Sequence, residues 1–141
     1  MEKTFELKNC ESLILANEAV KVLLEKKAID VKLFCVKESS GITDYYVNAT
    51  GRSSTQVSAL AGYLTEKLSE RGRDELRVEG RQASAWLLVD YGDVIVNIFD
   101  KPSREFYNFD RLLPEDALVD ISDVIAEVDK KYEINNTAKE D

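Results

Sequence analysis

Hydrophobic and polar positions follow two different periods along this chain, and together they predict helices interspersed with strands. Apolar residues at helical spacing predict helices over 12–27 and 53–71. Shorter runs rich in β-branched and aromatic residues predict strands at 31–36, 44–50 and 76–79. This order of elements indicates an α/β fold.

The stretch 86–99 carries the strongest strand signal. It predicts two strands joined by a turn around Gly92, and apolar residues occupy both alternating positions of each strand. Such a hairpin has to be covered on both faces. Trp86, Leu88 and Asp90 share one face by strand alternation. If helices cover the opposite face, the face with the tryptophan is the one left for a partner.

These elements predict an α/β (α+β-like) domain with about five strands and helices mainly on one face. We expect a single globular domain over 1–113, with Pro114 at its edge. Residues 114–141 are expected to form an acidic tail, with a short helix followed by disorder from about Asn135. The aromatic-rich segment before this edge is expected to pack back onto the core, with Phe106, Tyr107, Phe109, Leu112 and Leu113.

Charge is distributed unevenly along the chain. The formal net charge is −8, and residues 114–141 carry nine acids against three bases, which leaves only −2 for residues 1–113. Phosphate contact needs a dense basic patch, which is missing from the sequence. We therefore expect no direct sequence-specific binding of nucleic acid, whereas a basic protein partner suits this charge.

The residues that carry most enzyme chemistry are scarce. Histidine is absent, which removes Ser-His-Asp and Cys-His nucleophiles and histidine-based zinc sites. Cys10 and Cys35 are too few for a disulfide scaffold and are predicted to be small apolar fillers. No signal peptide and no membrane-spanning run is recognisable. The expectation is a cytoplasmic protein with no catalytic residues, no metal and no cofactor.

Two short motifs could nevertheless carry chemistry. The Gly-Arg-Ser-Ser turn at 51–54 is similar to the phosphate-binding turn of nucleotidyltransferases, but those enzymes need an acidic pair on the next strand, where only Glu79 stands. Asp90 and Asp93 flank Gly92 and could bind a divalent metal, although Asp and Gly are also favoured in β-turns. Helix capping and turn formation are the favoured interpretations.

Several spaced blocks, taken in order, resemble the ribosomal silencing factors, also called the Iojap-related family. The resemblance runs from about 12 to 113. The blocks are Asp44-Tyr-Tyr-Val, Ala49-Thr-Gly-Arg-Ser-Ser, Arg77-Val-Glu-Gly, Trp86-Leu-Leu-Val-Asp-Tyr-Gly-Asp-Val-Ile-Val and Arg104-Glu-Phe-Tyr. The resemblance implies a mixed sheet with helices on one side, similar to the nucleotidyltransferase fold but without its catalytic acids.

The resemblance also implies a non-enzymatic repressor of translation. Such factors dock on ribosomal protein fourteen of the large ribosomal subunit and sterically block joining of the small subunit when nutrients are scarce. The resemblance implies that residues of the block that begins at Trp86 contact the partner. Residues of the block that begins at Arg104 either contact the partner or close the core. The first set is Trp86, Leu88, Asp90, Tyr91 and Asp93, and the second is Arg104 and Tyr107.

This chain departs from the family pattern at two positions. Asn97 stands where the family usually has histidine, and Pro114 stands where it often has tryptophan. Asn97 can still donate and accept hydrogen bonds, but it cannot titrate. Two other functions stay open at this point: a degenerate or active nucleotidyltransferase-like domain using Ser53 and Ser54, and a homodimer or adaptor that uses the same open sheet face.

Overall fold

The computed structural model describes residues 3–39, 41–81 and 85–140. Its strands form a six-stranded mixed sheet in the order β3-β4-β5-β2-β1-β6, which confirms the predicted fold class and adds one short strand to the five expected. The strands are β1 (Ile29–Cys35), β2 (Tyr45–Gly51), β3 (Arg77–Arg81), β4 (Trp86–Asp90), β5 (Val94–Asp100) and β6 (Leu118–Val119). The helices are α1 (Ser12–Glu25), α2 (Ser54–Glu70), α3 (Lys101–Tyr107) and α4 (Ser122–Glu140), with 3-10 turns η1 (Phe109–Leu112) and η2 (Glu115–Ala117).

The parallel pair β2–β5 forms the centre of the sheet, and the other neighbouring strands are antiparallel. The predicted hairpin is present as β4 and β5. Its turn places Gly92 at φ +92°, where a side chain would be strained. The Asp90 carboxylate accepts a hydrogen bond from the Gly92 amide at 2.7 Å. Asp90 therefore has the turn-forming role that its sequence neighbourhood favours.

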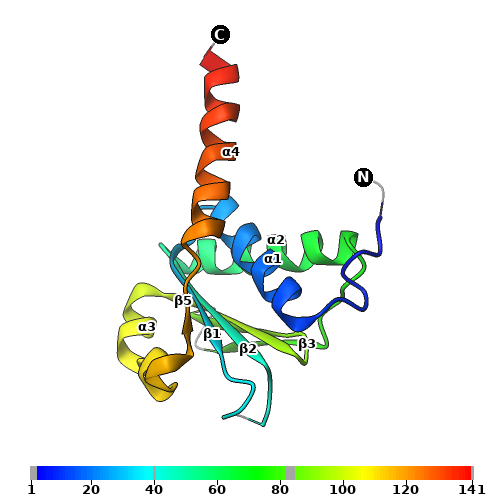
Figure 1. Cartoon of the computed structure of the whole chain (residues 1–141). Helices are drawn as coiled ribbons and strands as arrows, with labels where there is room; N and C mark the ends of the chain where they lie inside the picture. Colours follow the sequence, from blue (N-terminus) through cyan, green and yellow to red (C-terminus); the bar gives the residue numbers. More distant parts are fainter. Residues whose placement is uncertain (1–2, 40, 82–84, 141) are drawn as a thin grey trace.

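Helices α1 and α2 lie side by side over one face of the sheet, and α3 lies on the other side (Figure 1). Side chains alternate between the two faces along each strand, so every second side chain points toward α1 and α2 and forms the core there. The strand residues buried there include Leu33, Val47, Ala49, Val89, Val96 and Ile98. The opposite face carries Trp86, Leu88 and Asp90, as the sequence predicts.

Helix α1 ends in a Schellman motif that has lysine where glycine is usual. The Ala28 amide donates to the Leu23 carbonyl and the Lys27 amide to the Leu24 carbonyl, both at 3.0 Å. Lys27 has φ +65°. A non-glycine residue in this left-handed conformation costs about 1–2 kcal/mol. Glycine at position 27 would therefore end α1 with less strain.

The predicted ends of α2 are confirmed. Ser53 is the N-cap, and its hydroxyl accepts a hydrogen bond from the Gln56 amide at 3.1 Å. Gly72 follows the C-cap with φ +95°. A Cβ atom at Gly72 would lie 2.8 Å from the Cα of Phe5. The N-terminal segment thus packs directly against this glycine, and Leu7 enters the core beside it.

The chain after Pro114 is part of the same sheet. β6 pairs with β1, and Ala117 and Ile121 are buried. Leu113 and Ala117 also pack with Phe34 in a small second core, so the sheet and its packing continue across the expected domain edge. The strand β6 was not predicted, because two residues carry too little periodicity to be recognised.

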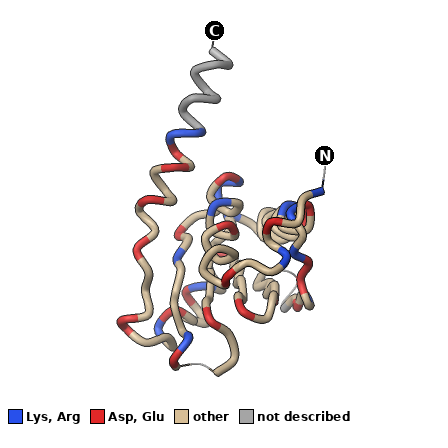
Figure 2. The backbone as a smooth tube through the Cα atoms, turned by 45° about the vertical axis from the view of Figure 1, so that its right-hand side comes forward, with Lys and Arg blue, Asp and Glu red and all other residues tan. Residues whose placement is uncertain are grey.

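Helix α4 projects away from the body of the protein, and its described acidic residues lie along its length (Figures 1 and 2). It packs against α1 at its base, where Glu127 pairs with Lys21 at 3.2 Å. The helix expected in the tail is present, but it is longer than predicted and continues to Glu140, past the start of the expected disorder at Asn135. None of the helices in the described ranges is long and apolar enough to cross a membrane.

We predict that Gly72→Ala lowers the free energy of unfolding by at least about 1 kcal/mol, because the new methyl group meets backbone atoms of Phe5 at a positive φ. Urea denaturation measures this. Gly62→Ala is the matched control, since Gly62 lies in α2 with nothing within 4 Å of an added Cβ, and should stabilise by about 0.5–1 kcal/mol. Equal stability of Gly72→Ala and the parent would contradict this assignment.

Candidate functional site

The sheet face opposite α1 and α2 is partly covered by α3, which contacts β5 and β2, and by η1, which contacts β2 through Phe109 and Asp110. Three aromatic rings from this cover and from β5 surround Trp86, which is itself half-buried. The Trp86 ring stacks on Phe99 with centroids 4.9 Å apart, and lies 5.0 Å from Tyr107 and 6.2 Å from Phe109. Trp86 is therefore both part of an aromatic cluster and accessible at its outer side.

A chain of hydrogen bonds runs from Trp86 across the middle of this face. The indole N–H of Trp86 donates to Asn97 Oδ1 at 3.0 Å, and Asn97 Nδ2 donates to Asn48 Oδ1 at 3.1 Å. Asn48 Nδ2 then donates to Asp110 Oδ1 at 2.7 Å. Asn48 and Asn97 are fully buried, so each needs these partners to offset its lost contact with water.

Arg104 completes this chain of hydrogen bonds, which we call the Asn48–Asn97 network. Its Nη2 donates to Asp110 Oδ2 at 2.9 Å, and its Nη1 donates to the Asp30 carbonyl at 2.6 Å and to Thr50 Oγ1 at 2.9 Å. Arg104 is only 8% exposed. Of the two roles that the sequence left open for Arg104, contact or closing core, its burial favours the second: it fixes α3 and η1 to β1 and β2.

The two carboxylates of the hairpin turn are already engaged within the protein. Asp90 Oδ2 accepts a hydrogen bond from Arg77 Nε at 3.1 Å, and Asp93 Oδ1 accepts one from Arg73 Nη2 at 2.6 Å. The side chain of Asp90 is 14% exposed and that of Asp93 is 29% exposed. A basic partner would therefore share these carboxylates with Arg77 and Arg73 rather than find them unpaired.

Tyr91 differs from its neighbours in the turn because it points into the core. It is 2% exposed, and burial, the largest cause, raises the pKa of its phenol above the usual range. A side chain in this position cannot reach a partner without a rearrangement. Tyr91 accordingly supports the turn from the core, whereas the side chains of Trp86, Leu88, Asp90 and Asp93 keep accessible surface.

The closing segment does not pack inward as a whole. Phe109 and Tyr107 contact Trp86, and Leu113 joins the small second core, as predicted. Phe106 is 81% exposed and Leu112 is 76% exposed, which contradicts the expectation for these two. The reason is helical phase: α3 directs Arg104 toward the sheet, so Phe106, two positions later, points outward. The Asp100 N-cap and Pro102 could have set this phase from sequence.

The accessible part of this face forms one surface over β4 and α3. We define the Trp86 surface by its exposed or half-exposed side chains: Trp86, Leu88, Asp90, Phe106 and Tyr107. Asp93 lies beyond Asp90 in the turn, where its carboxylate faces Arg73 after α2. Phe106 contacts Tyr107, with ring centroids 5.1 Å apart, and so extends the aromatic cluster outward. Aromatic anchors beside charged groups are typical of protein-binding surfaces.

The motifs weighed for catalysis have structural roles. The hydroxyl of Ser53 caps α2, and Glu79 on β3 pairs with Arg77 at 2.9 Å. In the part of the chain that the structure describes, His, Cys, Asp and Glu side chains form no group of three that could hold a metal ion. Fold and site thus define an α/β domain whose second sheet face carries an accessible aromatic cluster beside acidic side chains.

Comparison with known proteins assigns this domain to a family. A family model described as "Ribosomal silencing factor during starvation" matches residues 9–141. The ribosomal silencing factor of Halalkalibacterium halodurans is 36% identical over 120 residues, which cover 85% of this chain and 100% of that protein. The chain belongs to the ribosomal silencing factor family, and the resemblance drawn from its sequence blocks is confirmed.

Two further relatives agree with this assignment. The chloroplastic Iojap protein of Arabidopsis thaliana is 32% identical over 102 residues, covering 72% of this chain and 42% of that protein. A crystal structure of a Chromobacterium violaceum protein superposes with a TM-score of 0.70 at 31% identity, covering 73% of this chain and 86% of the other. The family name denotes regulation of ribosomes rather than catalysis.

We predict that Asn97→Leu lowers the free energy of unfolding by about 2 kcal/mol, because it removes the acceptor Oδ1 for the Trp86 indole N–H and the donor Nδ2 to the buried Asn48 Oδ1. Urea denaturation measures the loss. The fluorescence of Trp86, the single tryptophan of the chain, should shift in the folded state as well. Asn17→Leu makes the same exchange in α1, away from this network, and should change neither. Unchanged stability and emission of Asn97→Leu would refute the role of the Asn48–Asn97 network.

Proposed function

We propose that this protein represses translation by docking on the large ribosomal subunit through the Trp86 surface. Its contact there is ribosomal protein fourteen, and its bulk sterically blocks joining of the small subunit. The observation that carries this proposal is the half-exposed Trp86, held in a fixed orientation by the Asn48–Asn97 network and flanked by exposed aromatic rings. Family membership supports the ribosome as the target.

The physical character of the Trp86 surface suits a protein partner better than RNA. Trp86, Phe106 and Tyr107 offer large rigid anchors, and hot spots of protein interfaces are enriched in such residues. Asp90 and Asp93 add negative charge at one edge, which favours a basic protein and repels phosphates. An interface of ordinary size, about 800 Å² per partner, would extend beyond these residues.

The charge of the rest of the chain adds to the exclusion of the small subunit. The net charge is −8, and acidic residues lie along α4, which projects from the body (Figure 2). A protein of this charge, bound where two RNA-rich subunits meet, opposes their approach electrostatically as well as sterically. Blocking of subunit joining therefore requires no chemical step, and we propose that the protein is not an enzyme.

A homodimer is the competing use of the open sheet, and one observation favours it. β3 is an edge strand, and Leu76 beside it and Val78 within it are 72% and 47% exposed. Unpaired strand edges with apolar side chains are able to pair with a second copy. The nucleotidyltransferase alternative has less support, because the Ser53 hydroxyl is engaged in capping α2.

We predict that the protein co-sediments with purified large subunits and is absent from assembled ribosomes, and that Trp86→Ala weakens this binding by about 2 kcal/mol or more. Sedimentation at graded protein concentrations measures the loss. Ile14→Ala is the control, since Ile14 is 49% exposed on α1, on the other side of the sheet. A variant Phe106→Ala separates docking from folding, because this ring is 81% exposed and its removal should weaken binding at unchanged stability. Full binding by both aromatic variants would refute the Trp86 surface as the docking site.

Replacing both Asp90 and Asp93 by Asn should slow association with large subunits and flatten the dependence of binding on salt concentration. Association rates measured at several salt concentrations test this. The control changes the net charge equally through Glu38→Gln with Glu66→Gln, two exposed positions elsewhere. If both pairs alter the salt dependence alike, total charge rather than this surface governs the approach, and the proposed contact is wrong.

A further inference from the structure

A second site lies on the helix side of the sheet, away from the Trp86 surface. It is a pocket of about 420 Å³ between the end of α1, the end of β2, α2 and the base of α4. Its lining includes four cationic side chains, which are Lys26, Lys27, Arg52 and Lys131, against the two carboxylates of Glu25 and Asp129. This excess of positive charge is unusual in a chain with a net charge of −8.

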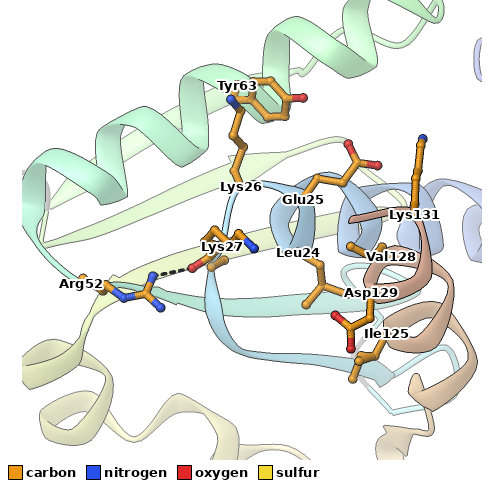
Figure 3. Close-up of a pocket in the computed structure, with 11 residues that line it drawn as sticks. Leu24, Glu25, Lys26, Lys27, Arg52, Tyr63, Ile125, Val128, Asp129 and Lys131 are labelled. Atoms are coloured by element: carbon orange, nitrogen blue, oxygen red, sulfur yellow. Dashed lines mark hydrogen bonds between the residues drawn. The ribbon is translucent and has the colours of Figure 1, made fainter. Parts of the chain in front are cut away.

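Three of the four cations, Lys26, Lys27 and Arg52, lie on one side of this pocket, and Lys131 lies on the α4 side (Figure 3). Arg52 Nη1 donates to the Lys27 carbonyl at 2.6 Å, which holds the two residues together (Figure 3). Lys26 lies with its Nζ 4.4 Å from the centre of the Tyr63 ring. Figure 3 shows Ile125, Val128 and Asp129 of α4 on the opposite side. The pocket thus has a cationic wall, an aromatic ring and, on α4, a wall in which Ile125 and Val128 are apolar and Asp129 and Lys131 are charged.

The backbone at Lys27 gives an independent reason to expect a use for this side chain. Lys27 takes the left-handed conformation that ends α1, at a position where glycine would be less strained. A cation near the C-terminal end of a helix complements the helix dipole, but Lys26 already provides that cation without left-handed backbone. The helix dipole therefore does not explain why position 27 is lysine rather than glycine. A need for the Lys27 side chain in the pocket does explain it. Strain of this kind is concentrated at functional sites.

The location also agrees with a ligand site. Arg52 directly follows β2, whose carboxyl end lies beside that of its parallel neighbour β5, and ligands of open α/β sheets bind at such ends. The volume falls in the range of small-molecule sites. A nucleic-acid strand fits less well, because Asp129 of α4 and Glu25 of α1 line the pocket and would repel a run of phosphates.

We propose that this pocket binds a small phosphorylated molecule. Lys27 and Arg52 hold the phosphate, with Lys26 adding charge, while Tyr63 and the apolar side chains Leu24, Ile125 and Val128 accept the organic part. The site is separate from docking on the ribosome, so either proposal can fail alone. Because α4 forms one wall, the ligand bridges α4 to α1 and holds this helix against the body.

Calorimetric titration of the full chain, without magnesium, tests the site with pyrophosphate, ATP and adenosine as probes. Saturable binding of pyrophosphate and ATP at one molecule per chain is expected, and none of adenosine. The decisive variant is Lys27→Gly, which removes the cation and relaxes the backbone. It should weaken binding at least tenfold while the melting temperature of the unliganded protein stays the same or rises. Lys8→Ala removes one exposed charge outside the pocket and should bind like the parent.

Hydrogen exchange gives a second readout, because bound ATP should slow exchange in the first turns of α4. Three results would overturn the proposal: no saturable binding of either phosphate probe, equal affinity of Lys27→Gly and the parent, or adenosine binding as tightly as ATP. None of these results bears on sedimentation with the large subunit, so the docking proposal is judged by its own experiments.

Discussion

The hydrogen bonds between Asn48 and Asn97 are the constraint on which the second face of the sheet depends. Two amides buried in the central strands of a sheet are costly unless their polar atoms are paired. Here Trp86 supplies a donor at one end and Asp110 an acceptor at the other. The network therefore holds α3 and η1 on the sheet at a fixed place, which apolar packing alone would specify less sharply.

This arrangement gives the two faces of the sheet different physical characters. The face under α1 and α2 is apolar and closed, and it provides most of the hydrophobic core. The other face is held by polar contacts and covered only in part, so aromatic rings stay accessible beside a rigid support. A binding surface built on such a support loses little conformational entropy when a partner arrives. This member of the ribosomal silencing factor family thus combines a closed apolar core with one open, aromatic face.

The sequence was a good guide where local signals are strong. Periodicity and capping residues located α1, α2 and the β4–β5 hairpin, and strand alternation placed Trp86, Leu88 and Asp90 on one face. It was a poor guide where position depends on distant contacts. Nothing local indicates that Arg104 is buried against β1 and β2.

The same limit explains the remaining differences between expectation and structure. The strand β6 is only two residues long and exists because β1 offers it an edge. Exposure of Phe106 depends on the phase of a short helix, which aromatic content does not reveal. The pocket lined by Lys26, Lys27, Arg52 and Lys131 escaped the sequence analysis because these cations come from the end of α1, the turn after β2 and α4, and only folding brings them together.

The long sequence separation between the hydrogen-bonded residues has a consequence during synthesis of the protein on the ribosome. Asn48 pairs with Asn97, which is 49 positions later, and Arg104 reaches back 74 positions to Asp30. Contacts of such long range form late and cannot be replaced by local ones. During synthesis the first half of the chain therefore leaves the ribosome without the strand that completes its sheet. The surface that surrounds Trp86 is complete only after Asp110 has emerged, so under the proposed docking an unfinished chain has no finished surface with which to engage the ribosome that is making it.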